Sequence, residues 1–198
     1  METIRGRKTY ELDLNGLRKQ LAGYDRVLLD LGTGDGRHAR TLAGRFPGWF
    51  IIGLDACREN LREHSQAKLT NILFVIASAQ SLPEELKGLI SHIAINFPWG
   101  SLLEGLLTGD WALMTGLESV AQRKATLDLR LNGGALSQAG STLEAGAHTI
   151  YNNLRRAGWD MRAPLFMSHT ELRALPSTWA KRLAFGREPR AMLLTGRK

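Results

Sequence analysis

Residues 26–37 read RVLLDLGTGDGR and decide the fold class. The apolar run from Arg26 to Leu31 predicts a buried strand, and the glycine-rich turn after it leads into a helix that begins near Arg37. Glycine has no Cβ atom, so the backbone can turn sharply there and lie close to a ligand. The next helix directs its N-terminus at the same place. This strand–loop–helix unit predicts a ligand site beyond the carboxyl end of the strand.

The same alternation continues along the chain. Further strands are predicted over 49–55, 72–76, 91–97 and 125–131. Helices are predicted over 37–46, 58–68, 84–89, 102–107, 111–123 and 142–157. Strands that alternate with helices favour an α/β fold with a mainly parallel sheet. We expect a single domain over 1–198, with an N-terminal β-hairpin extension in 1–20, a Gly/Ser/Ala-rich linker in 137–146 and a basic region in 164–190.

The composition excludes several classes of protein. The chain has 198 residues, of which 43% are hydrophobic and 23% charged, so a packed core is expected. No apolar run reaches the roughly 18 residues that span a bilayer, and the N-terminus lacks the apolar stretch of a signal peptide. Cys57 is the one cysteine, which excludes an intrachain disulfide framework, and the histidines lack metal-ligand spacing. A cytoplasmic protein without a metal is the expectation.

The basic charge is concentrated near the C-terminus. Lys and Arg number 26 against 19 Asp and Glu, a formal net charge of +7. The surplus falls in the last quarter of the chain, after residue 150, whereas the part before it is neutral. Such a segment favours a polyanionic partner, most often a nucleic acid, although a solvated helix face would also carry this charge.

The glycine loop is compatible with two kinds of nucleotide cofactor. A dinucleotide fingerprint needs G-x-G-x-x-G, but the third glycine is absent because position 37 is Arg. An acidic residue, Asp30, two places before G-x-G-x-G resembles the first motif of class I S-adenosylmethionine methyltransferases. Asp55 ends the next predicted strand, 21 residues after Gly34, where a carboxylate can bind both hydroxyls of a ribose. The pattern therefore favours an S-adenosylmethionine site.

Two later strand ends supply further candidates for this site. The third strand is followed by Ala79 and Gln80, where small residues suit an adenine slot and the amide could bond the adenine amino edge. The fourth strand ends in Asn96-Phe97-Pro98-Trp99. That stretch is close to the N-P-P-Y/F/W motif of enzymes that methylate exocyclic amines of DNA and RNA. Phe97 in place of the first proline is the departure from that motif.

Taken together, the motifs resemble one family. DLGTGDGR (30–37), GLDACRENL (53–61), FVIASAQSLPEELK (74–87), FPWGSLLE (97–104) and STWAKRLAFGR (177–187) are similar to the aminoglycoside-resistance 16S rRNA (adenine(1408)-N(1))-methyltransferases. The resemblance implies a class I methyltransferase fold, Rossmann-like, with a mainly parallel seven-stranded sheet flanked by helices. It also implies S-adenosyl-L-methionine as cofactor, S-adenosyl-L-homocysteine as product, and adenine 1408 in helix 44 of the 30S subunit as target. A monomer is implied as well.

The resemblance also assigns roles to residues. Trp99 and Trp179 match the pair that sandwiches the flipped adenine. The residues implied to bind the cofactor are Asp30, Gly32, Thr33, Gly34, His38, Asp55, Ala56, Ala79, Gln80, Asn96, Phe97, Pro98, Trp99, Gly100, Ser101, Ser177, Thr178 and Trp179. The residues expected to bind RNA are Arg5, Arg7, Lys8, Lys181, Arg182, Arg187 and Arg190, with either Arg187 or Arg190 as the main phosphate contact.

Three other functions compete with this interpretation. An exocyclic-amine methyltransferase would use Asn96-Phe97-Pro98-Trp99 in the manner of the related motif. A ribosome-binding homologue with little catalysis would keep the fold and the basic region. A small-molecule methyltransferase is the least favoured, because it leaves the basic C-terminal region without a purpose.

Overall fold

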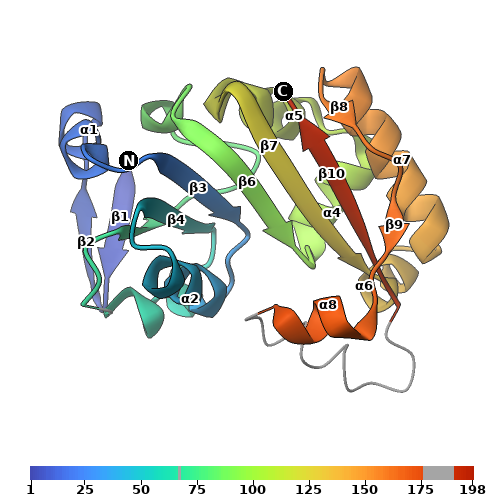
Figure 1. Cartoon of the computed structure of the whole chain (residues 1–198), viewed down its shortest axis with the longest axis horizontal. Coiled ribbons are helices and arrows are strands. Elements are labelled where there is room, and N and C mark those ends of the chain that lie inside the picture. The colour runs from blue at the N-terminus through green and yellow to red at the C-terminus, as the bar shows by residue number, and fades with distance from the viewer. Residues whose placement is uncertain (67, 176–189) are drawn as a thin grey trace.

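The structure is a computed structural model that describes residues 1–66, 68–175 and 190–198. Within these residues, ten strands form one mixed sheet (Figure 1). The strands are β1 (Glu2–Arg5), β2 (Lys8–Glu11), β3 (Arg26–Leu31), β4 (Trp49–Asp55), β5 (Ile72–Ile76), β6 (Ile90–Asn96), β7 (Ala121–Asn132), β8 (Asp160–Met161), β9 (Leu165–Phe166) and β10 (Ala191–Arg197). Their order is β2-β1-β5-β4-β3-β6-β7-β10-β8, and β9 also pairs with β10.

The centre of the sheet is parallel, as the alternation of elements predicts. β5, β4, β3, β6 and β7 run in the same direction, and β10 pairs antiparallel to β7. The stretch from β5 to β8 in this order contains the expected seven strands. The hairpin β1–β2 lengthens the sheet at the β5 edge, through an antiparallel bridge between Thr3 and Val75. The chain thus has the class I methyltransferase architecture, with an N-terminal hairpin.

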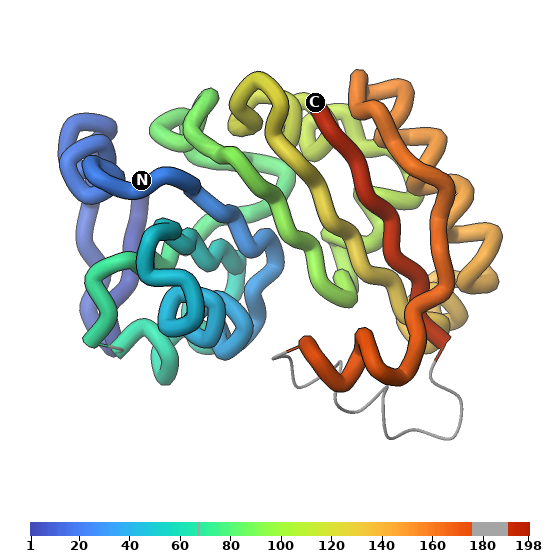
Figure 2. Tube along the Cα trace, viewed as in Figure 1, coloured from blue at the N-terminus to red at the C-terminus, as the bar shows by residue number. Residues whose placement is uncertain are grey.

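Helices cover both faces of the sheet. They are α1 (Leu14–Leu21), α2 (Arg37–Arg45), α3 (Arg58–Leu61), α4 (Gly100–Thr108), α5 (Trp111–Val120), α6 (Gly133–Gln138), α7 (Leu143–Arg156) and α8 (His169–Ala174), with single 3₁₀ turns η1 (His64–Gln66) and η2 (Glu84–Leu86). Figures 1 and 2 show α2 in front of β3 and β4, whereas α4, α5 and α7 lie behind the other half of the sheet. None of the helices in the described part of the chain is long and apolar enough to cross a membrane.

The apolar runs of the central strands form a core on both faces, which is typical of buried parallel strands. On one face Leu29, Ile52 and Ile93 are fully buried and pack in the large cluster that includes α4, α5 and α7. On the other face Leu28 and Ile51 pack in a smaller cluster with residues of α2. Because the strands are buried on both faces, their carboxyl ends are held rigidly in one row.

Three predicted helices are shorter in the structure than in the sequence pattern, and one of them, predicted over 111–123, ends at Val120 because β7 begins at Ala121. The stretch 58–68 was expected to be one helix, but α3 ends at Leu61 and η1 follows. Ser65 is buried there, and its Oγ accepts a hydrogen bond from the Gly6 N–H, 2.8 Å away, so the segment turns to meet the hairpin. The stretch 84–89 is helical only as the 3₁₀ turn η2.

The expected linker over 137–146 is wrong at both ends. Ser137 belongs to α6, and Gly146 lies within α7, which leaves only residues 139–142 between the helices. A Cβ atom on Gly146 would lie 2.4 Å from a methyl carbon of Leu136, so the glycine allows α6 and α7 to pack closely. The small residues of this segment serve helix packing and do not mark a flexible linker.

Candidate active site

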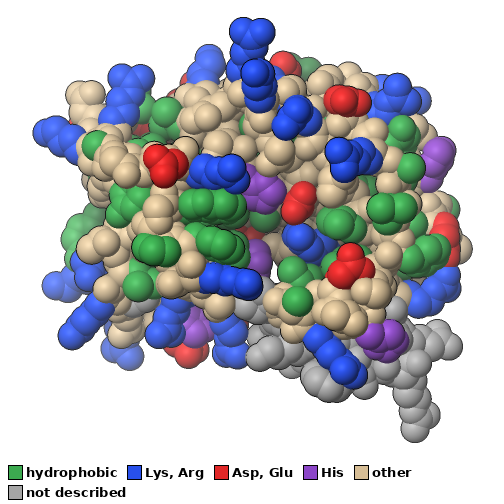
Figure 3. Space-filling model, in the orientation of Figure 1, with side chains coloured by type: hydrophobic (Ala, Val, Ile, Leu, Met, Phe, Trp, Pro, Cys, Tyr) green, Lys and Arg blue, Asp and Glu red, His purple; other side chains and the backbone are tan. Residues whose placement is uncertain are grey.

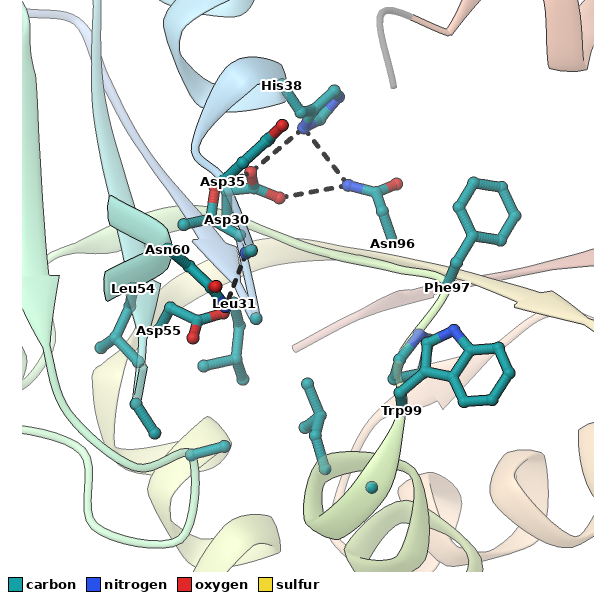
Figure 4. A pocket seen from close by; sticks show the side chains of 18 of the residues that line it. Asp30, Leu31, Asp35, His38, Leu54, Asp55, Asn60, Asn96, Phe97 and Trp99 are labelled. Atoms are coloured by element: carbon teal, nitrogen blue, oxygen red, sulfur yellow. Dashed lines mark hydrogen bonds and ion pairs between the residues drawn. The ribbon is translucent and has the colours of Figure 1, made fainter. Parts of the chain in front are cut away.

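A pocket of about 680 Å³ opens at the carboxyl ends of β3, β4, β5 and β6 (Figure 4). This volume lies within the range of about 300–1,000 Å³ that is usual for ligand sites. The strand-end loops converge here because parallel strands present their carboxyl ends at one edge of the sheet. Its lining residues are Asp30, Leu31, Gly32, Thr33, Gly34, Asp35, Arg37, His38, Leu54, Asp55, Ala56, Asn60, Ala77, Ser78, Ala79 and 96–102.

Asp30 is the centre of a buried polar network at the base of the pocket. Its Oδ2 accepts from the Thr33 hydroxyl at 2.6 Å and lies 3.2 Å from His38 Nδ1. Its Oδ1 accepts from Asn96 Nδ2 at 3.1 Å. Asn96 Nδ2 also lies 3.3 Å from His38 Nδ1, which closes a triangle of three side chains visible in Figure 4.

Asp30 is held in its ionised form. The residue is only 1% exposed, and burial by itself would raise the pKa of its carboxyl. The imidazole of His38 and the hydrogen bonds from His38, Thr33 and Asn96 outweigh that effect, so the pKa of Asp30 is lower than its ordinary value. A buried carboxylate with this set of donors orders the loop around it.

Backbone amides of the glycine loop donate hydrogen bonds to acceptors within the protein. The N–H groups of Gly32 and Thr33 both donate to the Leu54 carbonyl, at 2.9 and 3.0 Å. The Gly34 N–H donates to Asp55 Oδ2 at 2.9 Å. A pyrophosphate would need such amides free to receive its oxygens. This arrangement disfavours a dinucleotide and favours a nucleoside ligand.

Asp55 lies at the end of β4, half-buried, with its carboxylate fixed at both oxygens. Oδ2 accepts from Gly34, and Oδ1 accepts from the Cys57 N–H at 2.8 Å. An ionised carboxylate offers about four acceptor sites, so each oxygen keeps capacity for a ligand hydroxyl. The lone cysteine therefore contributes a backbone amide beside the carboxylate.

The segment after β5 matches the expectation only in part. Ala77, Ser78 and Ala79 line the pocket, as a slot for a flat ring requires. Gln80, in contrast, is not among the lining residues. Its Nε2 donates to the Ser101 carbonyl at 2.9 Å, and its Oε1 accepts from Ser78 Oγ at 2.7 Å. Gln80 thus fastens this segment to the start of α4, and its predicted bond to adenine is not supported.

The strand-end loop after β6 has an unusual backbone. Phe97 has φ +54, a left-handed conformation that is uncommon for residues other than glycine. Its ring is 3% exposed and packs with Met167, Leu172 and Ala191. Trp99 follows at the N-cap position of α4 and is half-buried. In Figure 4, Trp99 lies on the opposite side of the pocket from Asp55, and Asp30 and Asn96 lie above them in this view.

The expected RNA-binding residues are only partly described. Arg5, Arg7 and Lys8 are exposed at the turn of the hairpin β1–β2. Arg190 is exposed and forms an ion pair with Glu144 at the start of α7. Ser177, Thr178, Trp179, Lys181, Arg182 and Arg187 lie outside the described residues. Figure 3 shows lysine and arginine side chains around the hairpin, on the left of the view.

Several residues of the pocket were missed by the sequence analysis. Asp35, Arg37 and Asn60 line it beside the predicted glycine loop and Asp55. Arg130 does not line it, but its Nη1 donates to Asn96 Oδ1 at 3.0 Å. The alternation of ATLDLRL (125–131) places Arg130 on a defined face of β7, but only the register with β6 brings it opposite Asn96.

Comparison with known proteins decides the family. The sequence profile of the NpmA family, described as 16S rRNA (adenine(1408)-N(1))-methyltransferase, matches residues 2–198. The chain belongs to this family. A relative from Escherichia coli with that description is 32% identical over 206 residues, covering 95% of this chain and 94% of the relative. Another, from Streptoalloteichus hindustanus, is 31% identical and covers 100% of this chain and 99% of the relative.

Solved structures of similar proteins agree with this assignment. The 16S rRNA methyltransferase KamB superposes with a TM-score of 0.89 at 28% identity, over 100% of this chain and 99% of that chain. A variant of the 16S rRNA (adenine(1408)-N(1))-methyltransferase from Catenulisporales acidiphilia, described with cosubstrate SAM, has a TM-score of 0.87 at 26% identity, over 100% of this chain and 96% of that chain. As a member of this family, the protein is an S-adenosylmethionine-dependent methyltransferase.

The pocket fits that cofactor on its own geometry. Gly34 has φ +58, and a Cβ atom there would meet nothing within 4 Å, so the loop leaves open space for a ligand. Asp55 offers carboxylate oxygens to a diol, and the small side chains of Ala77 and Ala79 leave room for a flat ring. Asp30, His38 and Asn96 supply polar groups at the other end of the cavity. A long, amphipathic nucleoside with a charged tail matches this distribution.

Proposed function

We propose that this enzyme methylates N1 of adenine 1408 in helix 44 of 16S rRNA, with the assembled 30S subunit as its substrate. The family assignment supports the rRNA target. The observation that carries the proposal is the pocket itself, which is lined by the Asp55 carboxylate and by Trp99 at the start of α4. We also infer that the enzyme acts as a monomer in the cytoplasm and protects the subunit from aminoglycosides.

S-adenosylmethionine supplies an activated methyl group on its sulfonium sulfur. We infer that Asp55 binds the ribose hydroxyls and that Ala77, Ser78 and Ala79 surround the adenine ring. Asn96 and the loop around Asp30 would bind the methionine end. Both oxygens of Asp30 already accept hydrogen bonds from protein groups, so its role toward the methionine moiety is mainly to order Thr33, His38 and Asn96.

Methylation of adenine N1 does not require the protein to transfer a proton before the attack. N1 carries an in-plane lone pair and is unprotonated at neutral pH, so no general base has to remove a proton first. The protein's contribution is therefore proximity and orientation, which is worth roughly 7–11 kcal/mol in favourable cases. Rigid strand ends are suited to this task because they hold the loops that carry the contacts.

Trp99 has the position of a base-stacking residue. N1 lies on the pairing edge of adenine, so the base must leave the helix before it reacts. Stacking on an aromatic side chain contributes about 1–3 kcal/mol per base, and an aromatic face also stabilises the positive charge that develops on the ring. We propose that Trp99 and Trp179 hold the flipped adenine between them.

The main competing function is methylation of an exocyclic amine. In that chemistry the amide oxygen of the motif asparagine must accept from the target amino group. Here Asn96 Oδ1 accepts from Arg130, and Asn96 Nδ2 donates to Asp30. Both ends of the amide are held within the protein, which leaves Asn96 Oδ1 one of its two acceptor sites for a target amine and so favours N1 as the methylated atom.

The basic residues provide the docking contacts in this proposal. Arg5, Arg7 and Lys8 present cations on a hairpin turn that is fastened to the pocket side by the Gly6–Ser65 hydrogen bond. Lys181, Arg182 and either Arg187 or Arg190 complete the expected set. Cations of this kind bind phosphate oxygens and make the affinity for RNA depend on salt.

The proposal is tested by identifying the methylated nucleoside. Purified 30S subunits are incubated with the enzyme and labelled S-adenosylmethionine, and the 16S rRNA is then digested to nucleosides. We expect 1-methyladenosine to carry the label. N6-methyladenosine would instead establish the exocyclic-amine function. Binding to the subunit without any labelling would establish a ribosome-binding homologue, and turnover without RNA a small-molecule enzyme.

A further inference from the structure

We propose that Arg130 is a positioning residue that fixes both the side chain of Asn96 and the backbone of Phe97. Arg130 lies near the end of β7, directly opposite Asn96 in the parallel register with β6. Its side chain is 15% exposed, and it is not among the residues that line the pocket. Its influence on the site is therefore indirect, through the residues that it holds.

The first contact sets the direction of the Asn96 amide. A guanidinium group only donates hydrogen bonds, so the atom that faces Arg130 Nη1 at 3.0 Å has to be the Asn96 oxygen. The amide nitrogen is then directed at Asp30, whose carboxylate only accepts. The contacts with Arg130 and with Asp30 therefore assign the same orientation to the Asn96 amide. Without Arg130, the Asn96 oxygen would lose its donor, and the amide would be held only by the contact of its nitrogen with Asp30.

The second contact holds the loop that follows. The Phe97 N–H donates to the Arg130 carbonyl at 2.8 Å, at the residue whose φ is +54. A left-handed residue other than glycine persists only where its surroundings hold it in place. Position 130 thus holds two successive residues, Asn96 through the arginine side chain and Phe97 through the backbone carbonyl that any residue there would supply. Trp99 follows two residues after Phe97.

Arg130 is itself fixed by a neighbour on its own strand. Its Nη2 donates to Asp128 Oδ2 at 3.2 Å, and Asp128 and Arg130 share one face of β7. The planar guanidinium therefore spans two partners, Asp128 and Asn96, from different nitrogens. A lysine has one nitrogen on a flexible chain and does not reproduce this fork. The arrangement makes arginine specifically suited to the position.

These contacts give Arg130 two effects on the enzyme. Through Asn96 it orders the polar network beneath the methionine end of the cofactor, and through Phe97 it orders the loop that carries Trp99. The first effect concerns the cofactor, which the family assignment establishes. The second rests on the proposed role of Trp99 in holding the target adenine.

A double-mutant cycle on cofactor binding tests the first effect. S-adenosylmethionine affinity is measured by calorimetry, without RNA, for Arg130→Ala, Asn96→Ala and the double variant. We expect each single substitution to weaken binding roughly tenfold and the double variant to be no weaker than the worse single variant, because both remove the same contact. Losses that multiply in the double variant would overturn the proposal.

The matched control is Arg123→Ala, an exposed arginine near the other end of the same strand. It is expected to bind the cofactor as the unaltered protein does, and its effects should multiply with those of Asn96→Ala. If Arg130→Ala does not fold, as judged by thermal unfolding, the cycle is carried out with Arg130→Lys. A weakening in Arg123→Ala equal to that in Arg130→Ala would assign the effect to net charge and contradict positioning.

Turnover on 30S subunits tests whether the contact of the Arg130 side chain with Asn96 also matters for methyl transfer, since the backbone contact with Phe97 is kept in any Arg130 variant. Arg130→Lys keeps the positive charge but loses the fork, so we expect kcat to fall at least tenfold with KM for the subunit unchanged within twofold. Unaltered kcat with a raised KM would show that Arg130 contacts RNA, and full activity would remove it from positioning. Because the binding cycle uses no RNA, it gives its answer even if adenine 1408 is not the target.

Discussion

Asp30 illustrates how single residues combine structural and functional demands. It is a charged group beneath the pocket, nearly without exposure, and three donor side chains surround it. Burying a charge is costly unless hydrogen bonds satisfy it. Its position two places before the glycine loop was visible in the sequence. Its contact with Asn96 was not, because Asn96 reaches it only when β6 lies beside β3.

The ionised state of Asp30 predicts a dependence of stability on pH. The pKa of Asp30 is lower in the folded protein than its ordinary value of 3.8, so the folded protein binds fewer protons there than the unfolded chain. This contribution is complete well above the ordinary value of 3.8 and is lost as the pH falls through the lowered pKa. We expect Asp30→Asn to lower the free energy of unfolding at pH 7 by roughly 1–3 kcal/mol. The difference from the unaltered protein should shrink in acid, and a difference that grows below pH 4 would contradict it. Denaturant unfolding at several pH values measures the loss of stability at pH 7 and its change in acid.

Asp55 should carry much of the cofactor's affinity. Hydrogen bonds to charged groups contribute about 1.5–3 kcal/mol each, so Asp55→Ala is expected to weaken S-adenosylmethionine binding roughly 10- to 150-fold. Calorimetry gives the affinity directly. Asp25→Ala, an exposed carboxylate before β3, is the matched control and should leave the affinity unchanged. Equal affinities for the Asp55 variant and the control would remove Asp55 from the site.

Trp99 should matter for turnover and little for cofactor binding. Losing a stacking contact of about 1–3 kcal/mol predicts a fall in kcat/KM of roughly 5- to 150-fold for Trp99→Ala, with a smaller fall for Trp99→Phe. Trp111 is 79% exposed at the start of α5 and provides the control, because Trp111→Ala removes an indole away from the pocket. Methyl transfer to 30S subunits is the assay. Full activity in Trp99→Ala would contradict base stacking.

At the scale of elements, the strands were easier to predict than the short helices. Arg26–Leu31, Trp49–Asp55 and Ile72–Ile76 have the predicted bounds, because continuous apolar runs are needed where a strand is covered on both faces. The helix expected over 58–68 is broken because Ser65 accepts a hydrogen bond from the Gly6 N–H of the hairpin. A contact between residues so far apart in the chain leaves no local signal.

The glycine loop offers a prediction about the junction of β3 and α2. Gly36 has φ +78, and a Cβ atom there would lie 2.5 Å from the Phe74 ring, which fills the space beneath the loop. Left-handed backbone costs roughly 1–2 kcal/mol for other residues, and overpacking adds about 1–3 kcal/mol. Gly36→Ala should therefore destabilise by roughly 2–5 kcal/mol. Gly34 has φ +58, and a Cβ atom there would meet open space, so Gly34→Ala should show the backbone cost alone. Thermal unfolding compares the stabilities of the two variants. Equal losses of stability in the two variants would exclude a clash between the new methyl group at position 36 and the Phe74 ring.

Across the whole molecule, the sequence indicates chemistry better than geometry. The glycine loop, Asp55 and Trp99 could be predicted because their residue types follow strands in a recognisable order, and all of them line one pocket. Gln80 was predicted to bond adenine because its residue type suits that contact, whereas in the structure its amide bonds Ser78 and Ser101. Arg130 was missed because its role depends on strand register. Residue types indicate what a site needs, and the pairing of strands decides which side chains supply it.

The most direct measurement is reverse transcription across the decoding site of 30S subunits treated with enzyme and S-adenosylmethionine. A methyl group on N1 blocks base pairing, so we predict a strong stop at adenine 1408 that requires both enzyme and cofactor. Subunits treated with Trp99→Ala should show a weaker stop at the same position. Methyl incorporation without a stop at that adenine, or with a stop elsewhere, would contradict the proposed target.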